Sequence, residues 1–226
     1  MRLGVLFSGG KDSTLALYKA MKREDVVCLI TVISENKESY MFHTPNIHLT
    51  KFQAKAVGLP IVFITTKGKK EEELKELERV IKIAKEKFGI QGIVTGTVES
   101  VYQATRIQKI CYSLGLWCFN PLWQRDQMEI LKEIVGLGFD VIITGVFAEP
   151  FDSSWLGRKI NSKTIDELKK LSESYEVSPA GEGGEFETTV LDGPIFKKRL
   201  EVKEFSTDFS KGSGIMEIKK LELKEK

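Results

Sequence analysis

Short apolar runs alternate with amphipathic segments over the first half of the chain. Leu3–Phe7 and Val26–Ile33 carry no charge, which is typical of strands buried on both faces. Glu71–Phe88 instead has apolar residues three and four positions apart against a charged face, which predicts a helix packed on a sheet. Further strands are expected at Ile61–Thr65, Gln91–Thr95 and Leu116–Phe119, and further helices at Thr14–Met21, Thr44–Gly58 and Tyr102–Leu114. The helix after the second strand should start at Thr44 as N-cap, with Pro45 in its first turn.

This alternation predicts an α/β protein with a Rossmann-like parallel sheet, because right-handed crossovers join successive parallel strands. Ligands on such sheets bind beyond the carboxyl ends of the strands. A second, smaller C-terminal α+β unit is expected to begin near Asn120-Pro121, to divide the chain into residues 1–120 and 121–226, and to close over the acceptor site. Its predicted elements are helices at Gln127–Leu137 and Thr164–Tyr175, a strand at Asp140–Val146, and β-prone segments at Arg199–Phe205 and Ile215–Leu223.

The most specific local pattern is Ser8-Gly9-Gly10-Lys11-Asp12-Ser13, which joins the first strand to the first helix. A strand that turns through glycines into a helix N-terminus presents backbone N–H groups and the positive end of the helix dipole, which suits a phosphate. Lys11 adds a positive charge, and Asp12 can face a phosphate-bound Mg²⁺ ion. We expect both side chains at an exposed loop mouth, with Ser8 and Ser13 bonded to phosphate. An ordinary strand-to-helix turn is the alternative.

The loop resembles the PP-loop of the ATP pyrophosphatases, which have a HUP-type fold and cleave ATP between its α- and β-phosphates. Three further blocks look like the diphthine-ammonia ligase family: Glu38–Pro45, Tyr102-Gln103 with Arg106, and the Gly-Glu-Gly-Gly-Glu-Phe-Glu-Thr block at Gly181–Thr188. Pro121–Arg125 fits the same family. The resemblance therefore covers nearly the whole chain.

The resemblance implies ATP-dependent amidation of diphthine, a modified histidine of translation elongation factor 2, to diphthamide through an acyl-adenylate, with release of AMP and pyrophosphate. It implies ATP and Mg²⁺ as cofactors, and elongation factor 2 and ammonium as partners. A carboxylate is a poor electrophile until adenylation gives it a good leaving group, and Lys11 with Mg²⁺ would stabilise the departing pyrophosphate. No glutaminase pattern is recognisable, so free ammonium is the expected nitrogen donor.

Three glutamates surround two glycines in a segment without a helical pattern. If the part after Gly184 is extended, Glu185 and Glu187 project to one face as paired carboxylates. Such a pair suits ammonium capture, proton transfer or a second Mg²⁺ ion, and an acidic surface loop is the alternative. The predicted catalytic residues are Lys11, Asp12, Glu185 and Glu187, with Asp12 also the metal ligand.

Other positions are expected to bind the nucleotide or the acceptor. The nucleotide-binding set is the loop, Ser8, Gly9, Gly10, Lys11, Asp12 and Ser13, together with His43 and Gly96. The acceptor-binding set is Glu99, Tyr102, Gln103, Arg106, Trp123, Gln124, Arg125, Glu182, Gly183, Gly184 and Thr188. Aromatic faces attract cations such as the trimethylammonium group of diphthine by roughly 0.5–2 kcal/mol. Trp123 and Trp155 are the better candidates for that contact, whereas Trp117, which falls in a predicted strand, fits packing in the core at least as well.

Composition narrows the class of partner. Lys plus Arg number 34 against 32 for Asp plus Glu, so no overall basic field favours a nucleic-acid partner. No uncharged apolar stretch approaches the ~20 residues that cross a bilayer, and no signal-peptide pattern is visible, so we expect a cytoplasmic protein without a membrane partner. Cys28, Cys111 and Cys118 are odd in number and lack a C-x-x-C pair, which disfavours a disulfide framework and a zinc site.

Three questions stay open at the level of sequence. The motifs allow another PP-loop AMP-forming amide ligase or an RNA-modifying enzyme, although the lack of paired cysteines disfavours sulfur transfer. They also allow a non-catalytic ATP-binding regulator. A homo-oligomer is a further open alternative.

Overall fold

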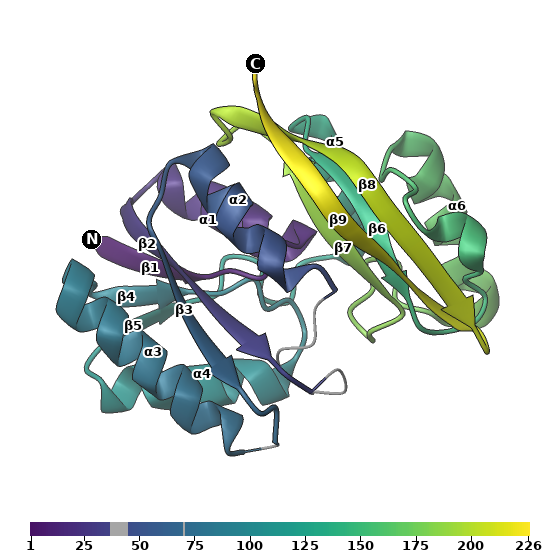
Figure 1. Cartoon of the computed structure of the whole chain (residues 1–226). Helices are drawn as coiled ribbons and strands as arrows, with labels where there is room; N and C mark the ends of the chain where they lie inside the picture. Colours follow the sequence, from purple (N-terminus) through teal and green to yellow (C-terminus); the bar gives the residue numbers. More distant parts are fainter. Residues whose placement is uncertain (37–44, 70) are drawn as a thin grey trace.

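The first unit of the protein is a parallel sheet. The computed structural model describes residues 1–36, 45–69 and 71–226. Five strands lie in the order β3-β2-β1-β4-β5, and each neighbouring pair is parallel (Figure 1). They are β1 (Arg2–Leu6), β2 (Asp25–Ser34), β3 (Ile61–Thr66), β4 (Gly92–Val94) and β5 (Trp117–Phe119). The α/β fold expected from the alternating pattern is confirmed.

Helices cover both faces of this sheet, as Figure 1 shows. They are α1 (Lys11–Met21), α2 (Thr50–Val57), α3 (Glu73–Phe88) and α4 (Val101–Ser113). α1 and α2 share one apolar core with the sheet, whereas α3 and α4 pack into a second core on the other face. Leu29 of β2 belongs to the first core and Ile30 to the second. Burial on both faces explains why this strand reads as a continuous apolar run.

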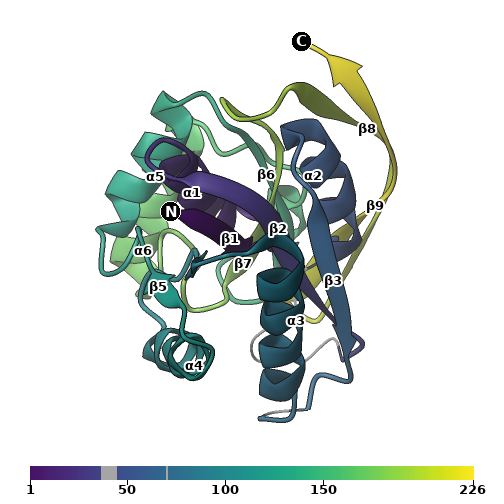
Figure 2. The same ribbon diagram turned by 90° about the vertical axis from the view of Figure 1, so that its left-hand side faces the viewer.

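The second unit is built on an antiparallel sheet in the order β7-β6-β9-β8. Its elements are α5 (Gln127–Gly136), β6 (Asp140–Val146), the short 3-10 helix η2 (Ser153–Trp155), α6 (Ser162–Tyr175), β7 (Phe186–Asp192), β8 (Lys198–Ser210) and β9 (Ser213–Glu225). The two β-prone segments are confirmed as strands, and each is extended to 13 residues. Figure 2 shows the β8–β9 ribbon running past α2, which is in contact with β8.

The two units share one apolar core. Leu17 of α1 and Ile143 of β6 are both fully buried members of it. Backbone hydrogen bonds also join the units, because Val190 N donates to Gly9 O at 3.0 Å and Lys197 N donates to Ala56 O at 2.7 Å. The C-terminal unit is therefore packed against the first unit through buried contacts. The boundary expected at residues 120 and 121 falls between β5 and α5 and stays a prediction.

The second helix starts later than its sequence suggested. Thr44 lies outside the described residues, and Pro45 lies in a turn followed by a 3-10 helix, η1 (Ile47–Leu49), so that α2 begins at Thr50. Asn46 has φ 65°, and its side chain bonds to the backbone of β9, donating to Met216 O and accepting from Ile218 N, each at 2.8 Å. This tertiary contact overrides the local helix-start signal.

Candidate active site

The phosphate-loop motif lies at the carboxyl end of β1, in the middle of the parallel sheet. Because β2 continues the sheet on one side of β1 and β4 on the other, this is the topological switch point at which open α/β sheets bind ligands. Within the loop, Ser8 Oγ and Ser13 Oγ are 3.1 Å apart and hydrogen-bonded, and Ser13 Oγ donates to Gly10 O at 3.2 Å. The two serines predicted to bind phosphate are thus already brought together.

Two glycines allow close backbone approach around this loop. Gly9 has φ 80°, and a Cβ there would lie 2.1 Å from Gln53 Oε1. Gly96, which follows β4, approaches α1 so closely that a Cβ would lie 2.6 Å from Ser13 N. Gly9 and Gly96, two of the three glycines predicted to bind the nucleotide, are therefore required by the backbone conformation and packing of the loop.

The prediction that Lys11 and Asp12 lie at an exposed loop mouth is wrong for Lys11. Its side chain is only 5% exposed, against 24% for Asp12, and Lys11 Nζ donates to Asp12 Oδ2 at 2.7 Å. The C-terminal unit causes this burial, because Phe186 of β7 lies under the ammonium, 5.7 Å from Nζ to the ring centroid. Asp12 Oδ1 is buried without a hydrogen-bond partner among the described residues.

Two carboxyl groups of residues Gly181–Thr188, which we call the C-terminal block, face this ion pair. Glu182 Oε1 lies 4.0 Å from Lys11 Nζ, and Glu187 interacts electrostatically with both Lys11 and Asp12. Burial first, and then the charge of Asp12, raise the pKa of Glu182 to about 8, although Lys11 lowers it. Burial also raises the pKa of Glu187 to about 7. We call Lys11, Asp12, Glu182 and Glu187 the charged cluster.

The charged cluster also changes the lysine. Burial lowers the pKa of Lys11, but the charges of Asp12 and Glu182 and the hydrogen bond to Asp12 outweigh burial and leave that pKa raised. Lys11 is thus held as a cation. With its two carboxyls of near-neutral pKa, the cluster combines a fixed positive charge with groups that exchange protons near pH 7, as acid-base catalysis requires.

Glu185 has a different environment from Glu187. Its carboxylate accepts hydrogen bonds from Ser178 N at 2.7 Å and from Gly183 N at 2.9 Å. It therefore holds together the loop that carries Glu182, with Gly184 supplying a positive φ of 85°. The structure groups Glu182 with Glu187 in the charged cluster, where sequence periodicity had paired Glu185 with Glu187.

Thr188 connects the block to the phosphate loop directly. Thr188 is 4% exposed, and its hydroxyl accepts a hydrogen bond from Lys11 N at 3.1 Å. Gln53 adds a second connection that sequence reasoning missed, since its Nε2 donates to Gly9 O at 2.9 Å and to Val190 O at 2.8 Å. In the sequence, its only signal is a polar side chain on the same helix face as the apolar Leu49 and Ala56. The phosphate loop is consequently clamped between α2 and β7.

The residues that follow β5 differ in their environments. Gln127, also missed from sequence, donates to Glu99 Oε1 at 3.1 Å and accepts from Ala180 N at 3.0 Å, so it ties the β4–α4 loop to the C-terminal block. Gln124 adopts φ 53° and is exposed, and Trp123 is half-buried. Arg125 bonds instead to Glu133 of α5 at 2.5 Å, so its guanidinium faces α5.

The Tyr102 and Arg106 positions form a separate group at the start of α4. The Arg106 guanidinium stacks on the Tyr102 ring, 3.4 Å from its centroid, and bonds to Glu71 Oε1. Gln103 N is engaged in capping the helix by donating to Ser100 Oγ at 3.3 Å.

The tryptophan assignments need correction. Trp155 is 7% exposed and packs edge-on against Phe151, with ring centroids 5.0 Å apart, so it belongs to the core. Trp117, expected in the core, is 67% exposed because β5 is the edge strand of the parallel sheet. Of the three tryptophans, Trp123 is the half-buried one, and its contact with a ligand stays a prediction.

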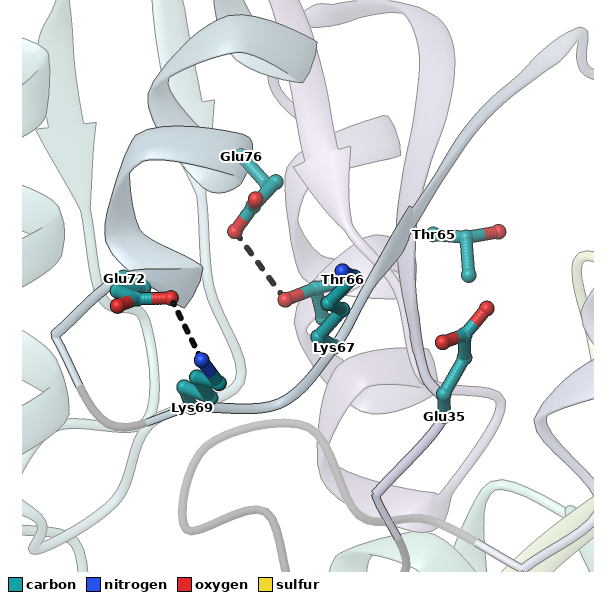
Figure 3. A pocket seen from close by; sticks show the side chains of 7 residues that line it. All are labelled: Glu35, Thr65, Thr66, Lys67, Lys69, Glu72 and Glu76. Atoms are coloured by element: carbon teal, nitrogen blue, oxygen red, sulfur yellow. Dashed lines mark hydrogen bonds and ion pairs between the residues drawn. The ribbon is translucent and has the colours of Figure 1, made fainter.

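A cavity of about 250 Å³ opens beyond β2 and β3, apart from the charged cluster (Figure 3). Its lining is polar: Glu35, Thr65, Thr66, Lys67, Lys69, Glu72 and Glu76. Thr66 donates to Glu76 across its floor at 3.1 Å, and Lys69 pairs with Glu72 at 3.9 Å. Hydroxyls and carboxylates of this kind suit a polar ligand group at the same sheet edge as the phosphate loop. His43, predicted to contact the nucleotide, lies outside the described residues.

Family models match both units of the chain. A model described as the diphthamide synthase N-terminal domain matches residues 1–118, and one described as the diphthamide synthase C-terminal domain matches residues 126–223. The chain belongs to the diphthamide synthase family. The resemblance noted in its motifs is confirmed, and the protein is a ligase of this family.

Two relatives named diphthine-ammonia ligase support the same assignment. The diphthine-ammonia ligase of Rattus norvegicus is 33% identical over 225 residues, which cover 89% of this chain and 83% of that protein. The Saccharomyces cerevisiae protein of that name is 30% identical over 87% of this chain but only 34% of its own length. Among solved structures, a predicted tRNA methyltransferase subunit from Methanocaldococcus jannaschii matches at 20% identity and a TM-score of 0.46, over 86% of this chain and 98% of that one. In the described part of the chain, no helix has the length and apolarity needed to cross a membrane.

Proposed function

We propose that the protein amidates diphthine on translation elongation factor 2, using ATP and ammonium, and releases diphthamide, AMP and pyrophosphate. One observation carries the proposal: Lys11 and Asp12 of the phosphate loop lie in one charged cluster with Glu182 and Glu187 of the C-terminal block. Phosphate chemistry and carboxyl chemistry are thereby available in a single site. The relatives named diphthine-ammonia ligase support the acceptor that we assign.

The phosphate loop fits ATP together with Mg²⁺. Asp12 Oδ1, buried and without a partner among the described residues, suits a cation. Those residues contain no ready-made group of three or more His, Cys, Asp or Glu side chains that could hold a metal. Mg²⁺ on a nucleotide usually takes one or two carboxylates and completes its shell with phosphate oxygens and water, so Asp12 is the ligand we assign. Bound there, the ion would neutralise charge on the leaving pyrophosphate.

The reaction is proposed to run in two steps. First, an oxygen of the diphthine carboxylate bonds to the α-phosphorus of ATP while the bond to pyrophosphate breaks, which gives an acyl-adenylate. Second, ammonia nitrogen bonds to the acyl carbon, a proton leaves the nitrogen, and AMP departs with the oxygen it received. Lys11 acts in the first step, because an ammonium held in place by Asp12 stabilises the charge that develops on pyrophosphate.

Glu187 and Glu182 are proposed to act in the second step. Both lie close to the phosphate loop, and a buried carboxylate attracts ammonium and accepts its proton. The same negative surroundings favour the trimethylammonium group of diphthine, with Trp123 as the aromatic candidate. Glu185 holds the loop that carries Glu182, and is therefore a positioning residue.

The test supplies the purified protein with ATP, Mg²⁺, ammonium and diphthine-bearing elongation factor 2. We expect AMP and pyrophosphate only when the factor is present, with a mass change of the factor that corresponds to replacement of a hydroxyl by an amino group. AMP formation with tRNA or a small carboxylic acid instead would favour another PP-loop enzyme. ATP binding without turnover on any acceptor would favour a regulator.

The nitrogen donor is tested in the same assay. With free ammonium as donor, glutamine should not replace it. Dependence on glutamine, with ammonium inert, would contradict this part of the proposal while leaving the adenylation step intact.

A further inference from the structure

Two of the three cysteines meet at the edge of the parallel sheet. Cys111 lies near the end of α4, and Cys118 is the middle residue of β5. Between them the chain reverses at Gly115, which has φ 62°, and Leu116 N donates to Cys111 O at 2.8 Å. This tight turn places both side chains in one apolar core, where Cys111 is a buried member and Cys118 packs against it, so that the two thiols interact.

The two thiols are not equivalent. Cys111 is 1% exposed, whereas Cys118 is half-buried on the edge strand beside the exposed Trp117. The hydrogen bond from Cys111 lowers the pKa of Cys118 against the opposing effect of burial, and the same bond together with burial raises the pKa of Cys111. Since the thiolate is the reactive form of cysteine, Cys118 is the accessible nucleophile and Cys111 the thiol poised beside it.

We propose that Cys111 and Cys118 form a reversible disulfide when the protein meets a peroxide. The Cys118 sulfur bonds to one peroxide oxygen, the O–O bond breaks, and Cys118 becomes a sulfenic acid with release of one water. The Cys111 sulfur then bonds to the Cys118 sulfur and displaces the sulfenic oxygen as a second water. Two thiols are thus oxidised by two electrons, and one hydrogen peroxide molecule is reduced to two water molecules.

The cysteine pair adjoins the nucleotide-binding edge. Cys118 Sγ lies 4.0 Å from Asn120 Oδ1, which accepts a hydrogen bond from Thr95 Oγ1 at 2.7 Å. Thr95 immediately precedes Gly96, the glycine that touches the start of α1. A disulfide would draw Cys118 Sγ toward Cys111 and away from Asn120 Oδ1, the atom that accepts the hydrogen bond from Thr95. Oxidation should therefore disturb the loop at Thr95 and Gly96 and weaken ATP binding.

Cys28 provides an internal comparison. It is fully buried, and burial raises its pKa to about 12 although Arg2 lowers it. A buried thiol of high pKa is unreactive. The proposal thus predicts selective oxidation of one pair among three thiols.

The experiment exposes the reduced, folded protein to an equimolar amount of hydrogen peroxide, blocks free thiols with an alkylating reagent under denaturing conditions, and maps the peptides by mass spectrometry. We expect a linked Cys111–Cys118 peptide, an alkylated Cys28, and full reversal by dithiothreitol. Cys28→Ala should behave like the wild type. Cys111→Ser should leave Cys118 as a sulfenic acid that dimedone captures.

A second measurement compares ATP affinity of the oxidised and reduced wild type by calorimetry, with Cys111→Ser/Cys118→Ser as the control that peroxide should leave unchanged. Failure to form the linked peptide, or linkage of Cys28 at a similar rate, would overturn the disulfide proposal. Unchanged ATP affinity after full oxidation would overturn the effect on the nucleotide edge. Neither outcome depends on the ligase reaction.

Discussion

The phosphate loop and the C-terminal block contribute to the same site in opposite ways. In the loop, the important contacts are local: Lys11 bonds to its neighbour Asp12, and Ser8 to Ser13. In the block, they are long-range, since the hydrogen bond between Lys11 and Thr188 spans 177 positions. The loop is formed by contacts within its own segment. The side chains of the block reach Lys11 only because β7 packs against α1.

This difference shows where each region obtains its electrostatics. The loop alone would leave Lys11 solvated, as its sequence suggested. Packing of the block buries Lys11 and places two more carboxyls beside it, so the raised pKa values of Glu182 and Glu187 are products of assembly. Predictions that separate the loop from the block therefore test the comparison directly.

The largest effect is expected for Lys11→Met, which removes the cation common to both regions. AMP formation should fall by about 10²–10³, the usual loss for one charged or polar transition-state contact. The free energy of unfolding should also fall, by about 3 kcal/mol, because buried carboxyls lose their partner. Thermal melting and AMP release would be measured together, with Lys211→Met in the β8–β9 turn as a matched control. If Lys11→Met formed AMP at the wild-type rate, the phosphate loop would not take part in the reaction as proposed.

Glu187→Gln and Glu185→Gln separate the roles of two carboxyls within the block. Glu187→Gln should keep ATP binding and lose amide formation by about 10² or more, the range of general acid-base catalysis. Glu185→Gln should cost less, because the glutamine oxygen still accepts one of the two backbone hydrogen bonds from Ser178 and Gly183. Calorimetry with ATP and the mass of the factor are the two measurements. Equal losses in both variants would return Glu185 to the catalytic group.

The sequence predicted the loop more fully than the block for a physical reason. A strand-glycine-helix turn is encoded within a few residues, so Ser8–Ser13 and the flanking β1 and α1 are found where they were expected. The partner of a buried side chain depends on tertiary packing, which periodicity does not encode. Gln53 and Gln127 were missed for that reason, and Trp117 was placed in the core because edge position is a property of strand order.

The pH dependence of stability should report the assembled cluster. Glu182 and Glu187 bind their protons more tightly in the folded protein than in the unfolded chain, since their pKa values are about 8 and about 7. Their contribution to stability is therefore complete below about pH 4.5 and is lost as the pH rises through about 7 and about 8, at up to about 1.4 kcal/mol per pH unit for each group.

Denaturant unfolding in a chelator without ATP measures this dependence. Glu187→Gln should make the decline between about pH 5 and pH 7 shallower, because the variant lacks one of the two carboxyls whose proton the folded protein holds there and the unfolded chain does not. Thr189→Val, which changes no carboxyl, is the control and should keep the wild-type slope. An unchanged slope in Glu187→Gln would mean that its carboxyl titrates normally.

Gly96→Ala tests the contact of the β4–α4 loop with the phosphate loop. A Cβ there would lie 2.6 Å from Ser13 N and 2.7 Å from the Asp12 carbonyl carbon, both backbone atoms that give way at a cost. Overpacking of this kind costs about 1–3 kcal/mol of unfolding free energy, and ATP binding should weaken with it. Gly136→Ala in α5 meets nothing within 4 Å and should stabilise the protein by up to about 1 kcal/mol. If Gly96→Ala changed neither the free energy of unfolding nor ATP affinity, the close contact between the two loops would not be needed for either.

The smallest effect is expected for Thr188→Val, which keeps the shape of the side chain but removes the acceptor for Lys11 N. A buried N–H left without its partner costs about 1 kcal/mol. That N–H belongs to the first residue of α1, in the phosphate loop, so its loss of a partner should weaken ATP binding. A cost of about 1 kcal/mol is less than the 1.4 kcal/mol that corresponds to a factor of ten, so the affinity should fall by less than tenfold. Thr188→Ser keeps the hydroxyl and should keep the affinity.

Thr189→Val is the matched control for this last variant. Thr189 is as buried as its neighbour, 4% exposed, and its hydroxyl bonds to Thr144 Oγ1 at 3.1 Å within the second unit. Loss of that hydroxyl should reduce stability by a similar amount without changing ATP affinity, because the bond does not touch the phosphate loop. If Thr189→Val weakened ATP binding as much as Thr188→Val, the effect would come from general loosening of β7. A selective effect of Thr188→Val would show instead that one hydrogen bond from the block helps to set the phosphate loop.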